Sequence, residues 1–343
     1  GASASQRVGN APRGLEMWGW NEHLRDWSEV EKSLLMKSWR PSTLRSYKPA
    51  WTRWTTWAQI NHVSFNKPNG SDLSRFLAYL HNDERLSYNT ILSYKSAVST
   101  LCDPESSERL SSHPLVKRIL KSIAIANPKA PKPPIWDIDL VIKHMSQINS
   151  DVSNLYQVSK CTATILLLCS GRRVHDLTLL RVNPEDCNVS DNCITLIPAF
   201  GSKTDSSEYR QSGWQLKRNP DNKSLDPVYW IKRMIDVGKE RRDNADCDSL
   251  FVSTCGPAKP ASRSIIAGWV KNMLREAGID ASAGSFRAAV ASKSWLDNSP
   301  LEDILSRGNW RSNKTFQRFY CRKVINTDSN PNRSMSQLFN PLG

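Results

Sequence analysis

The stretch that decides the fold runs from residue 307 to residue 320 and reads RGNWRSNKTFQRFY. It holds Trp310 ten residues before Tyr320, and Phe316 and Phe319 fall where a core-facing side is expected. A phenol has an ordinary pKa of ~10, so Tyr320 needs neighbouring cations before it can act as a nucleophile. The alternative is that Tyr320 is one more packed aromatic.

Cations that could serve this tyrosine lie upstream. Residues 169–177 read CSGRRVHDL and place Arg173 at the start of an expected helix, where the helix N-terminus and a planar guanidinium both favour phosphate. Lys203 lies in an expected turn, from which a lysine can protonate a leaving oxygen. Arg287 follows the small residues 283–285, which would let a backbone phosphate approach closely.

Two side chains could complete such a site. Asp176 could hold the Arg173 guanidinium in place, and the Trp310 indole N–H could donate to a phosphate oxygen. Each residue also has a plainer interpretation. Arg173 and Asp176 could form a surface ion pair worth ~0–1 kcal/mol. Lys203 could be an exposed loop lysine, and Trp310 could fill the junction between helices. Arg172 is expected to face solvent or the DNA backbone.

The composition indicates a polyanionic partner. The 343 residues carry a formal charge of +14, and an excess this large favours nucleic acid, with a merely basic surface as the alternative. No stretch approaches the ~20 apolar residues of a membrane span. The eight cysteines include no Cys-x-x-Cys pair, which disfavours a zinc site and suits reduced, buried thiols.

The length favours two domains, because single cores usually split beyond roughly 250–300 residues. Residues 1–37 are an expected N-terminal arm, and 38–126 a helical domain of four helices. Residues 127–135 are rich in proline and lysine and indicate a linker. Residues 136–325 are expected to form a second, mainly helical domain with a small antiparallel β-sheet, and 326–343 a tail.

Capping signals place several helices. Ser42 is the expected N-cap of a helix that begins beside Pro41. Cys161–Ser170 is apolar nearly all round and indicates a buried helix closed by Gly171. Ser299–Glu302 resembles a capping box that opens a helix ending at Gly308.

One hairpin is expected in the second domain. Cys193–Ile197 has the composition of a strand, residues 201–207 that of a turn, and a return strand is expected through Tyr209. This hairpin would carry Lys203 at its tip.

Basic and hydrogen-bonding side chains on the expected helix faces and linker suit a DNA surface. The candidates are Arg45, Arg53, Tyr88, Asn89 and Lys95 in the first domain, Lys129 and Lys132 in the linker, and Arg172 and Arg311 in the second domain. A plain solvated linker is the alternative for the two linker lysines.

The order Arg173, Lys203, Arg287, Trp310 and Tyr320 resembles the tyrosine recombinase (phage integrase) family over most of the chain. Residues 171–177 are similar to the family's first arginine box, and Lys203 matches its hairpin lysine. Trp310 stands where most members have histidine and Cre-like members have tryptophan. The runs 285–289, 307–312 and 315–320 are most similar to the DIRS/Ngaro retrotransposon and Crypton branch.

One position departs from the family pattern. Gly284 stands where the family usually has histidine, and no histidine follows His175. Lys203, water or phosphate would then have to accept the Tyr320 proton, or the rate is lower. A catalytically inactive descendant is the alternative, and the intact tyrosine, lysine and arginines argue against it.

The resemblance implies a two-domain clamp around double-stranded DNA, with a core-binding and a catalytic domain. It implies a site-specific recombinase of a mobile element that cuts and rejoins strands through a 3′-phosphotyrosine, with Tyr320 as nucleophile and no metal or other cofactor. A homotetramer on DNA, a monomer or dimer off DNA, and a nuclear location are expected, and no membrane partner is. Two other classes stay open: a type IB topoisomerase-like enzyme, and a non-catalytic DNA-binding protein derived from a transposon recombinase.

Overall fold

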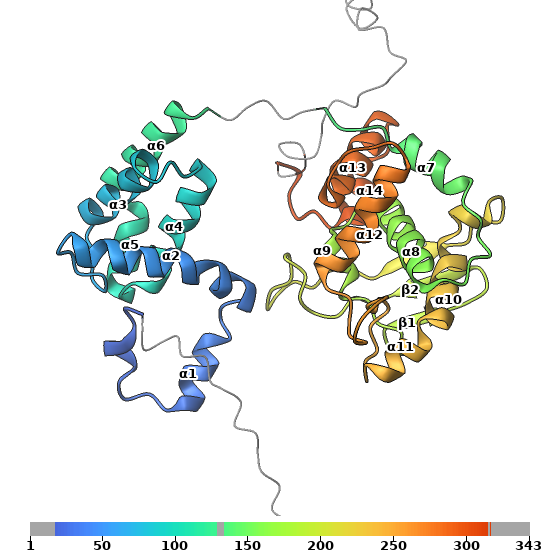
Figure 1. Cartoon of the computed structure of the whole chain (residues 1–343), viewed down its shortest axis with the longest axis horizontal. Coiled ribbons are helices and arrows are strands. Elements are labelled where there is room, and N and C mark those ends of the chain that lie inside the picture. Colours follow the sequence, from blue (N-terminus) through green and yellow to red (C-terminus); the bar gives the residue numbers. More distant parts are fainter. Residues whose placement is uncertain (1–17, 129–133, 315, 317–343) are drawn as a thin grey trace, which may run out of the picture. The chain divides into compact units, whose positions relative to one another are not determined.

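The computed structural model describes residues 18–128, 134–314 and 316. The chain divides into two compact units, one ending at Pro131 and one beginning at Lys132 (Figure 1). Helices dominate both units, and the described residues contain a single sheet of three short antiparallel strands. The fold class predicted from the sequence, mainly helical with a small antiparallel sheet, is confirmed.

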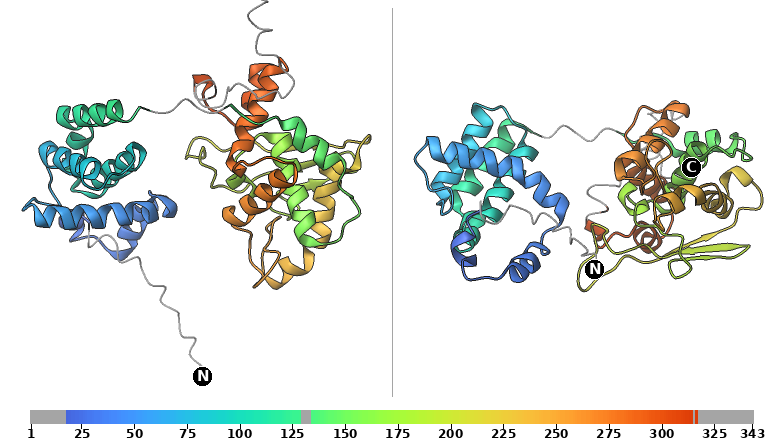
Figure 2. Two further views of the ribbon diagram at one scale, coloured as in Figure 1. Left: turned by 45° about the horizontal axis from the view of Figure 1, so that its top comes forward. Right: turned by 60° about the horizontal axis from the view of Figure 1, so that its bottom comes forward.

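The first unit contains only helices within its described residues. They are η2 (Asn21–Leu24), α1 (Glu29–Met36), α2 (Pro41–Ile60), α3 (Gly70–Asn82), α4 (Tyr88–Leu101), α5 (Pro104–Ser112) and α6 (Pro114–Ala126). Helix α2 packs along α4, and α3 packs against α6 and α4. In the left view of Figure 2, α2 lies along one side of the stack that the later helices form.

Tryptophans on one face of α2 form the centre of this core. Trp51 and Trp54 are buried, and Trp54 is 0% exposed. The Trp54 ring stacks on Trp57 at a centroid distance of 5.6 Å and meets Phe76 edge-on at 5.1 Å. Its indole N–H donates to the Phe65 carbonyl at 3.0 Å, so no buried donor is left unpaired there.

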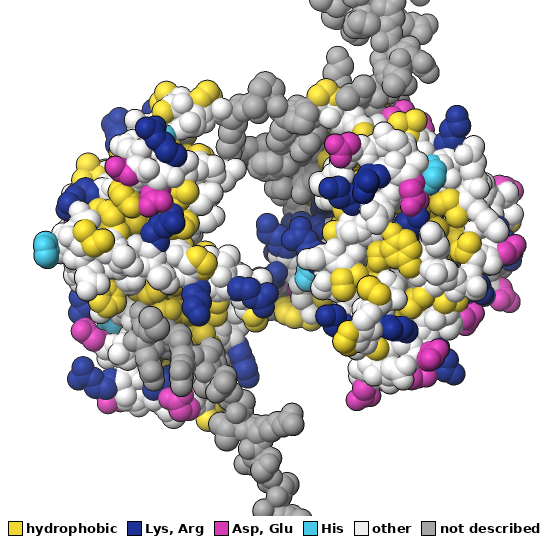
Figure 3. Space-filling view, viewed as in Figure 1, with side chains coloured by type: hydrophobic (Ala, Val, Ile, Leu, Met, Phe, Trp, Pro, Cys, Tyr) yellow, Lys and Arg dark blue, Asp and Glu magenta, His cyan; other side chains and the backbone are white. Residues whose placement is uncertain are grey.

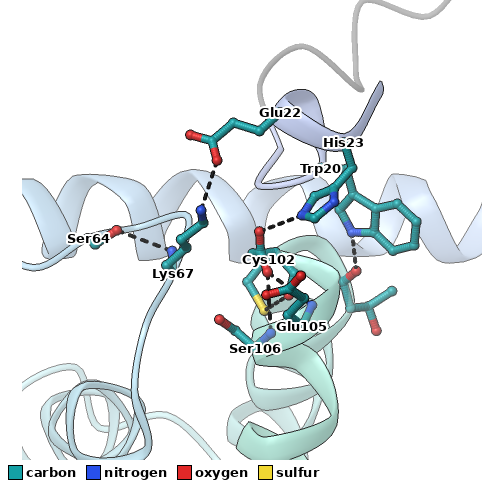
Figure 4. Close-up of polar contacts among 10 residues, drawn as sticks. Trp20, Glu22, His23, Ser64, Lys67, Cys102, Glu105 and Ser106 are labelled. Atoms are coloured by element: carbon teal, nitrogen blue, oxygen red, sulfur yellow. Dashed lines mark hydrogen bonds and ion pairs between the residues drawn. The ribbon is translucent and has the colours of Figure 1, made fainter. Parts of the chain in front are cut away.

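The segment before α1 is fastened to this unit by polar contacts (Figure 4). Trp20 donates its indole N–H to a carbonyl of α4 at 3.1 Å. A ring nitrogen of His23 lies 2.8 Å from the Asp103 carboxylate, which is buried and caps α5. The Lys67 ammonium pairs with Glu22 at 2.8 Å. These contacts tie the segment to the corner between α4 and α5 and to the connection between α2 and α3.

Two local predictions in this unit are wrong. Four helices were expected after residue 37, but α5 is a fifth, opened by the Asp103 carboxylate, which accepts from two backbone N–H groups, and by proline at the first helical position. Ser42 lies inside α2 and does not cap it. The N-cap is Arg40, which makes no side-chain capping bond, because Pro41 already presets the first helical φ.

The second unit is built around α8. Its elements are α7 (Ile138–Ser146), α8 (Leu155–Ser170), α9 (Val174–Leu177), β1 (Cys187–Val189), β2 (Cys193–Leu196), β3 (Trp214–Lys217), η3 (Lys223–Leu225), α10 (Pro227–Val237), α11 (Lys239–Asn244), α12 (Arg263–Glu276), η4 (Ala283–Ser285), α13 (Phe286–Leu296) and α14 (Leu301–Gly308). Helix α8 packs against α10, α12 and α13 and is buried over most of its length, as predicted. Gly171 ends it in the left-handed conformation, with φ 61°.

The sheet has the order β1-β2-β3 and is antiparallel throughout. Strand β2 pairs with β3 so that Ile194 lies opposite Leu216. The predicted return strand through Tyr209 is wrong, because the ladder resumes only at Trp214. Trp214 and Leu216 are buried alternately with exposed neighbours, which is the pattern that fixes a strand face. Residues 197–213 form a long connection instead.

Helix α14 ends at Gly308, as predicted, but the predicted capping box is wrong. The N-cap is Pro300, and Ser299 makes no side-chain capping bond. The backbone N–H of Ser299 bonds to the Ser294 carbonyl and closes the end of α13. The residue after the helix, Asn309, takes the left-handed conformation with φ 54° and ψ 53°.

No helix of the described residues is both long and apolar enough to span a bilayer. The same residues hold no cluster of three or more His, Cys, Asp or Glu side chains placed to bind a metal. Their cysteines are all free, and most are buried or half-buried, as predicted. Burial raises the pKa of the Cys102 and Cys161 thiols to about 12, so both stay protonated near neutral pH.

Candidate active site

Arg287 connects two of the segments that the sequence singled out. Its side chain is 3% exposed, and Nη1 donates to the carbonyl of Gly171 at 2.9 Å and to the carbonyl of Gly308 at 2.5 Å. Gly171 directly precedes the two arginines of the first box, and Gly308 lies two residues before Trp310. The fold therefore brings residues 171, 287 and 308 to one place.

Trp310 lies against the Arg287 guanidinium, whose central carbon is 3.7 Å from the centre of the indole ring. The ring also packs edge-on against Phe316 at 5.4 Å, so Trp310 fills a helix junction as well. A Cβ at position 308 would lie 1.7 Å from a carbon of the Trp310 ring. Only glycine at position 308 leaves room for this ring.

Arg173 stands at the N-terminus of α9, and its backbone N–H donates to Asp176 Oδ2 at 3.1 Å. Within the described residues, its guanidinium Nη1 is buried without a hydrogen-bond partner. A buried charged donor left unpaired costs several kcal/mol or draws in an acceptor. Arg173 is therefore a candidate ligand for an anion.

Asp176 does not hold the Arg173 guanidinium, and that prediction is corrected. Its carboxylate is 0% exposed and accepts from the Arg173 backbone and from the hydroxyl of Ser202 at 2.9 Å. Asp176 thus joins the start of α9 to the loop that carries Lys203. Its role in this structure is to connect the backbone at the start of α9 to the Ser202 side chain.

A second buried carboxylate shapes the Lys203 loop. Asp205 Oδ2 accepts from the backbone N–H groups of Gly201 and Ser202 at 2.9 and 2.8 Å, and Oδ1 accepts from Gln211 at 2.9 Å. The loop therefore has a defined form although it contains no strand. Lys203 at its tip is exposed and makes no ion pair with the described residues.

Arg172 is the main correction among the predicted DNA contacts. The side chain is 3% exposed and does not face solvent. It donates to the Gln211 side chain at 2.9 Å, to Ser212, and to the Arg307 carbonyl at 3.1 Å, and it lies over the Trp214 ring. Burial lowers its pKa to about 10. Its donors are used inside the protein, which leaves them unavailable to a DNA backbone.

Gly284 lies exposed in η4, the short helix that precedes Arg287. A Cβ built there would meet only the Ser282 hydroxyl, at 3.9 Å, so the backbone has room for a side chain. A histidine does lie elsewhere in this region: Nε2 of His175 is 3.3 Å from the Gly201 carbonyl. His175 lies within the first arginine box, residues 171–177, and this position in the sequence is the feature that marks it as a site residue.

Two further residues were missed. Tyr209 in the Lys203 loop and Asn309 beside Trp310 are joined by a hydrogen bond, in which the Tyr209 hydroxyl donates to the Asn309 side chain. The guanidinium of Arg311, a predicted DNA contact, is exposed and lies 4.7 Å from the centre of the Tyr209 ring. In Figure 3, Lys and Arg side chains gather beside the position of α9 in this unit.

The predicted DNA contacts of the first unit lie on α2 and α4. Arg45 and Asn89 are exposed, and Tyr88 is half-buried at the start of α4. Arg53 pairs with Glu84 at 3.3 Å and lies over the Tyr94 ring, so its guanidinium is already engaged. Burial lowers the pKa of Lys95. Lys129, Lys132, Tyr320 and the tail lie outside the described residues.

No family model matches the sequence, and no curated protein matches it. Among solved structures, the chain is similar to the Tn1549 transposon integrase in complex with transposon right end DNA, with a TM-score of 0.56 and 13% identity over 95% of this chain and 99% of that one. The same integrase in complex with circular intermediate DNA gives a TM-score of 0.53 and 12% identity, over 94% and 98%. The XerA recombinase covers 91% of this chain and 96% of its own, at 17% identity and a TM-score of 0.42. The chain thus shares its fold with the Tn1549 transposon integrase.

Proposed function

We propose that this chain is a site-specific DNA strand transferase of the tyrosine recombinase type, working through a 3′-phosphotyrosine. The observation that carries the proposal is Arg287, which is buried and donates to both the first arginine box and the segment before Trp310. In the adjoining segment, Arg173 has a guanidinium nitrogen without a partner in the described residues. Two guanidinium groups held in this way suit a phosphate.

Tyr320 is the proposed nucleophile, on the sequence and the fold resemblance alone. Its phenolic oxygen forms a bond to the scissile phosphorus while the bond from phosphorus to the 5′-oxygen breaks. Lys203 donates a proton to that leaving oxygen. A 5′-hydroxyl of another strand reverses the step, and the phosphotyrosine conserves the bond energy, so the reaction consumes no ATP.

Arg173 and Arg287 offset the negative charge that develops on the nonbridging oxygens. Removing one such donor from a comparable site costs ~2.7–4 kcal/mol of transition-state stabilisation. Trp310 holds the Arg287 guanidinium from one face, which limits its freedom before substrate binds. With glycine at position 284, water or the substrate phosphate accepts the Tyr320 proton.

The proposed substrate is double-stranded DNA at the ends of a mobile element, in the nucleus. The formal charge of +14 supports a DNA partner. The affinity should therefore fall as salt rises. The slope of log K against the logarithm of the salt concentration should be about −0.9 for each phosphate neutralised. Strand exchange needs four active sites on two duplexes, so the proposed working form is a tetramer on DNA.

Trapping of a covalent adduct tests this function. A preferred site is first selected from a random duplex library, and a duplex nicked next to the cleavage position then releases the short 5′-hydroxyl strand and prevents religation. The wild-type chain should form a protein–DNA adduct that survives denaturation, and Tyr320→Phe should form none. Binding without adduct would assign the chain to the non-catalytic class. Relaxation of supercoiled DNA that lacks recombination sites would favour the topoisomerase class.

A further inference from the structure

We propose that Thr204, Asn309 and Tyr209 form a positioning network that holds the Lys203 loop against the segment bearing Trp310. This inference rests on the proposed function, because it assigns the network to the proton transfer from Lys203. The three residues are positioning residues, since none is placed at the reacting atoms.

The network runs through the two ends of one amide. The Asn309 Nδ2 group donates to Thr204 Oγ1 at 2.8 Å, and Asn309 Oδ1 accepts from the Tyr209 hydroxyl. Thr204 is the residue after Lys203, and Tyr209 lies on the returning arm of the same loop. A single side chain from the end of α14 therefore contacts both arms of the Lys203 loop.

The backbone at Asn309 explains why an asparagine stands there. Its φ of 54° and ψ of 53° are left-handed, a conformation that glycine and asparagine adopt most readily. The residue is 3% exposed, so its amide must be satisfied inside the protein. Glycine would fit the backbone but would lose both contacts.

The network continues to the arginine of the proposed site. Gly308, directly before Asn309, accepts from Arg287, and Trp310, directly after it, lies on the Arg287 guanidinium. The loop contact and the arginine contacts therefore fall on three consecutive residues. Displacement of Asn309 would alter the position of Lys203 relative to Arg287.

Arg172 supplies an independent second tie between the same two segments. Its Nε donates to the Arg307 carbonyl at the end of α14, while Nη1 donates to Gln211 on the returning arm of the loop. Because this tie remains when the network is cut, the network variants should keep the fold and lose only the alignment of Lys203.

The test uses substitutions that remove one group each: Thr204→Val, Asn309→Gly and Tyr209→Phe. A misplacement of about 1 Å can cost ~10²-fold in rate, so each variant should cleave a nicked duplex roughly 10–100-fold more slowly than wild type. Tyr229→Phe is the matched control, because it also removes a tyrosine hydroxyl that donates a hydrogen bond, to the Ser150 carbonyl, but lies outside the network. It should cleave at the wild-type rate.

A sulfur leaving group separates positioning of the acid from general damage. When sulfur replaces the 5′-bridging oxygen, the leaving thiolate needs little protonation, since a thiol has a pKa of ~8.5. The network variants and Lys203→Ala should then cleave within about threefold of wild type, as lost alignment of the acid no longer matters. Arg287→Ala should stay slow on both substrates.

Two results would overturn the inference: wild-type rates for the three variants on the oxygen substrate, or an undiminished defect on the sulfur substrate. Failure of the proposed function has a different signature, because the wild-type chain itself would then form no adduct with either substrate.

Discussion

The guanidinium carbon of Arg287 lies 3.7 Å from the centre of the Trp310 indole ring, and Arg287 also donates to the carbonyl two residues before that ring. An arginine from the start of α13 and a tryptophan that follows α14 thus form one buried pair. The cation is positioned before any substrate binds, which is the arrangement expected of a group that stabilises developing charge.

Arg287→Ala should abolish adduct formation, with a loss of at least ~10²-fold, because one charge-stabilising donor is removed. Most of the DNA affinity should remain, since many phosphate contacts share it. Adduct yield on a nicked duplex and a binding titration at fixed salt measure the two effects. A thermal melt should accompany them, because the residue is buried. Cleavage at the wild-type rate would remove Arg287 from the site.

Gly284→His should raise the cleavage rate, because it places an imidazole at the position where the tyrosine recombinase family, which the sequence resembles, usually has histidine. The backbone has room, as a Cβ there meets only the Ser282 hydroxyl at 3.9 Å. A general base must be unprotonated to act, so the added rate should appear as pH rises through ~6.5. Gly284→Ala controls for the lost glycine. A pH–rate profile identical to that of wild type would mean that position 284 is remote from Tyr320.

Arg172→Met should destabilise the second unit by about 2–4 kcal/mol, because a buried guanidinium with several acceptors is removed and those acceptors lose their partners. Arg311→Met is the matched control, since Arg311 is exposed, and it should stay within about 0.5 kcal/mol. Denaturant melts followed by circular dichroism measure both. Equal stability of the two variants would contradict the buried role of Arg172.

The contact between His23 and Asp103 should open in acid. Burial works to raise the pKa of Asp103, but the hydrogen bonds from His23 and from the backbone of Glu105 and Ser106 outweigh it and lower the pKa overall. A carboxyl whose pKa is lower in the folded state than in the unfolded state stabilises the fold fully at pH values above its unfolded pKa of ~3.9. That stability is lost as the pH falls through the pKa of the folded state.

Hydrogen exchange of residues 18–24 should therefore rise as pH falls below ~3.9, after correction for intrinsic exchange rates. Asp103→Asn should show fast exchange in this segment already at neutral pH. Exchange that is independent of both acid and the substitution would show that the other contacts of the segment suffice to hold it.

Several predictions from the sequence followed from local rules and are confirmed by the structure. Apolar residues all round Cys161–Ser170 indicated a buried helix, and Gly171 ends it with a positive φ. Both features depend only on residues that are neighbours in the sequence. The errors arose where a local signal met a competing contact. Tyrosine itself favours strands, yet the buried Asp205 accepts hydrogen bonds from the backbone on both sides of Tyr209's loop and keeps the loop out of the ladder.

The sequence by itself determined the fold class and the residues that carry the resemblance, since helix periodicity, glycine stops and the order of Arg173, Lys203, Arg287 and Trp310 are properties of the chain alone. Only the tertiary structure decided how each arginine is used. Arg172 and Arg173 are adjacent and chemically identical, yet Arg172 donates to two segments in the interior and Arg173 retains a donor without a partner in the described residues. Which carbonyls and carboxylates meet a side chain depends on segments distant along the chain, and no local pattern contains that information.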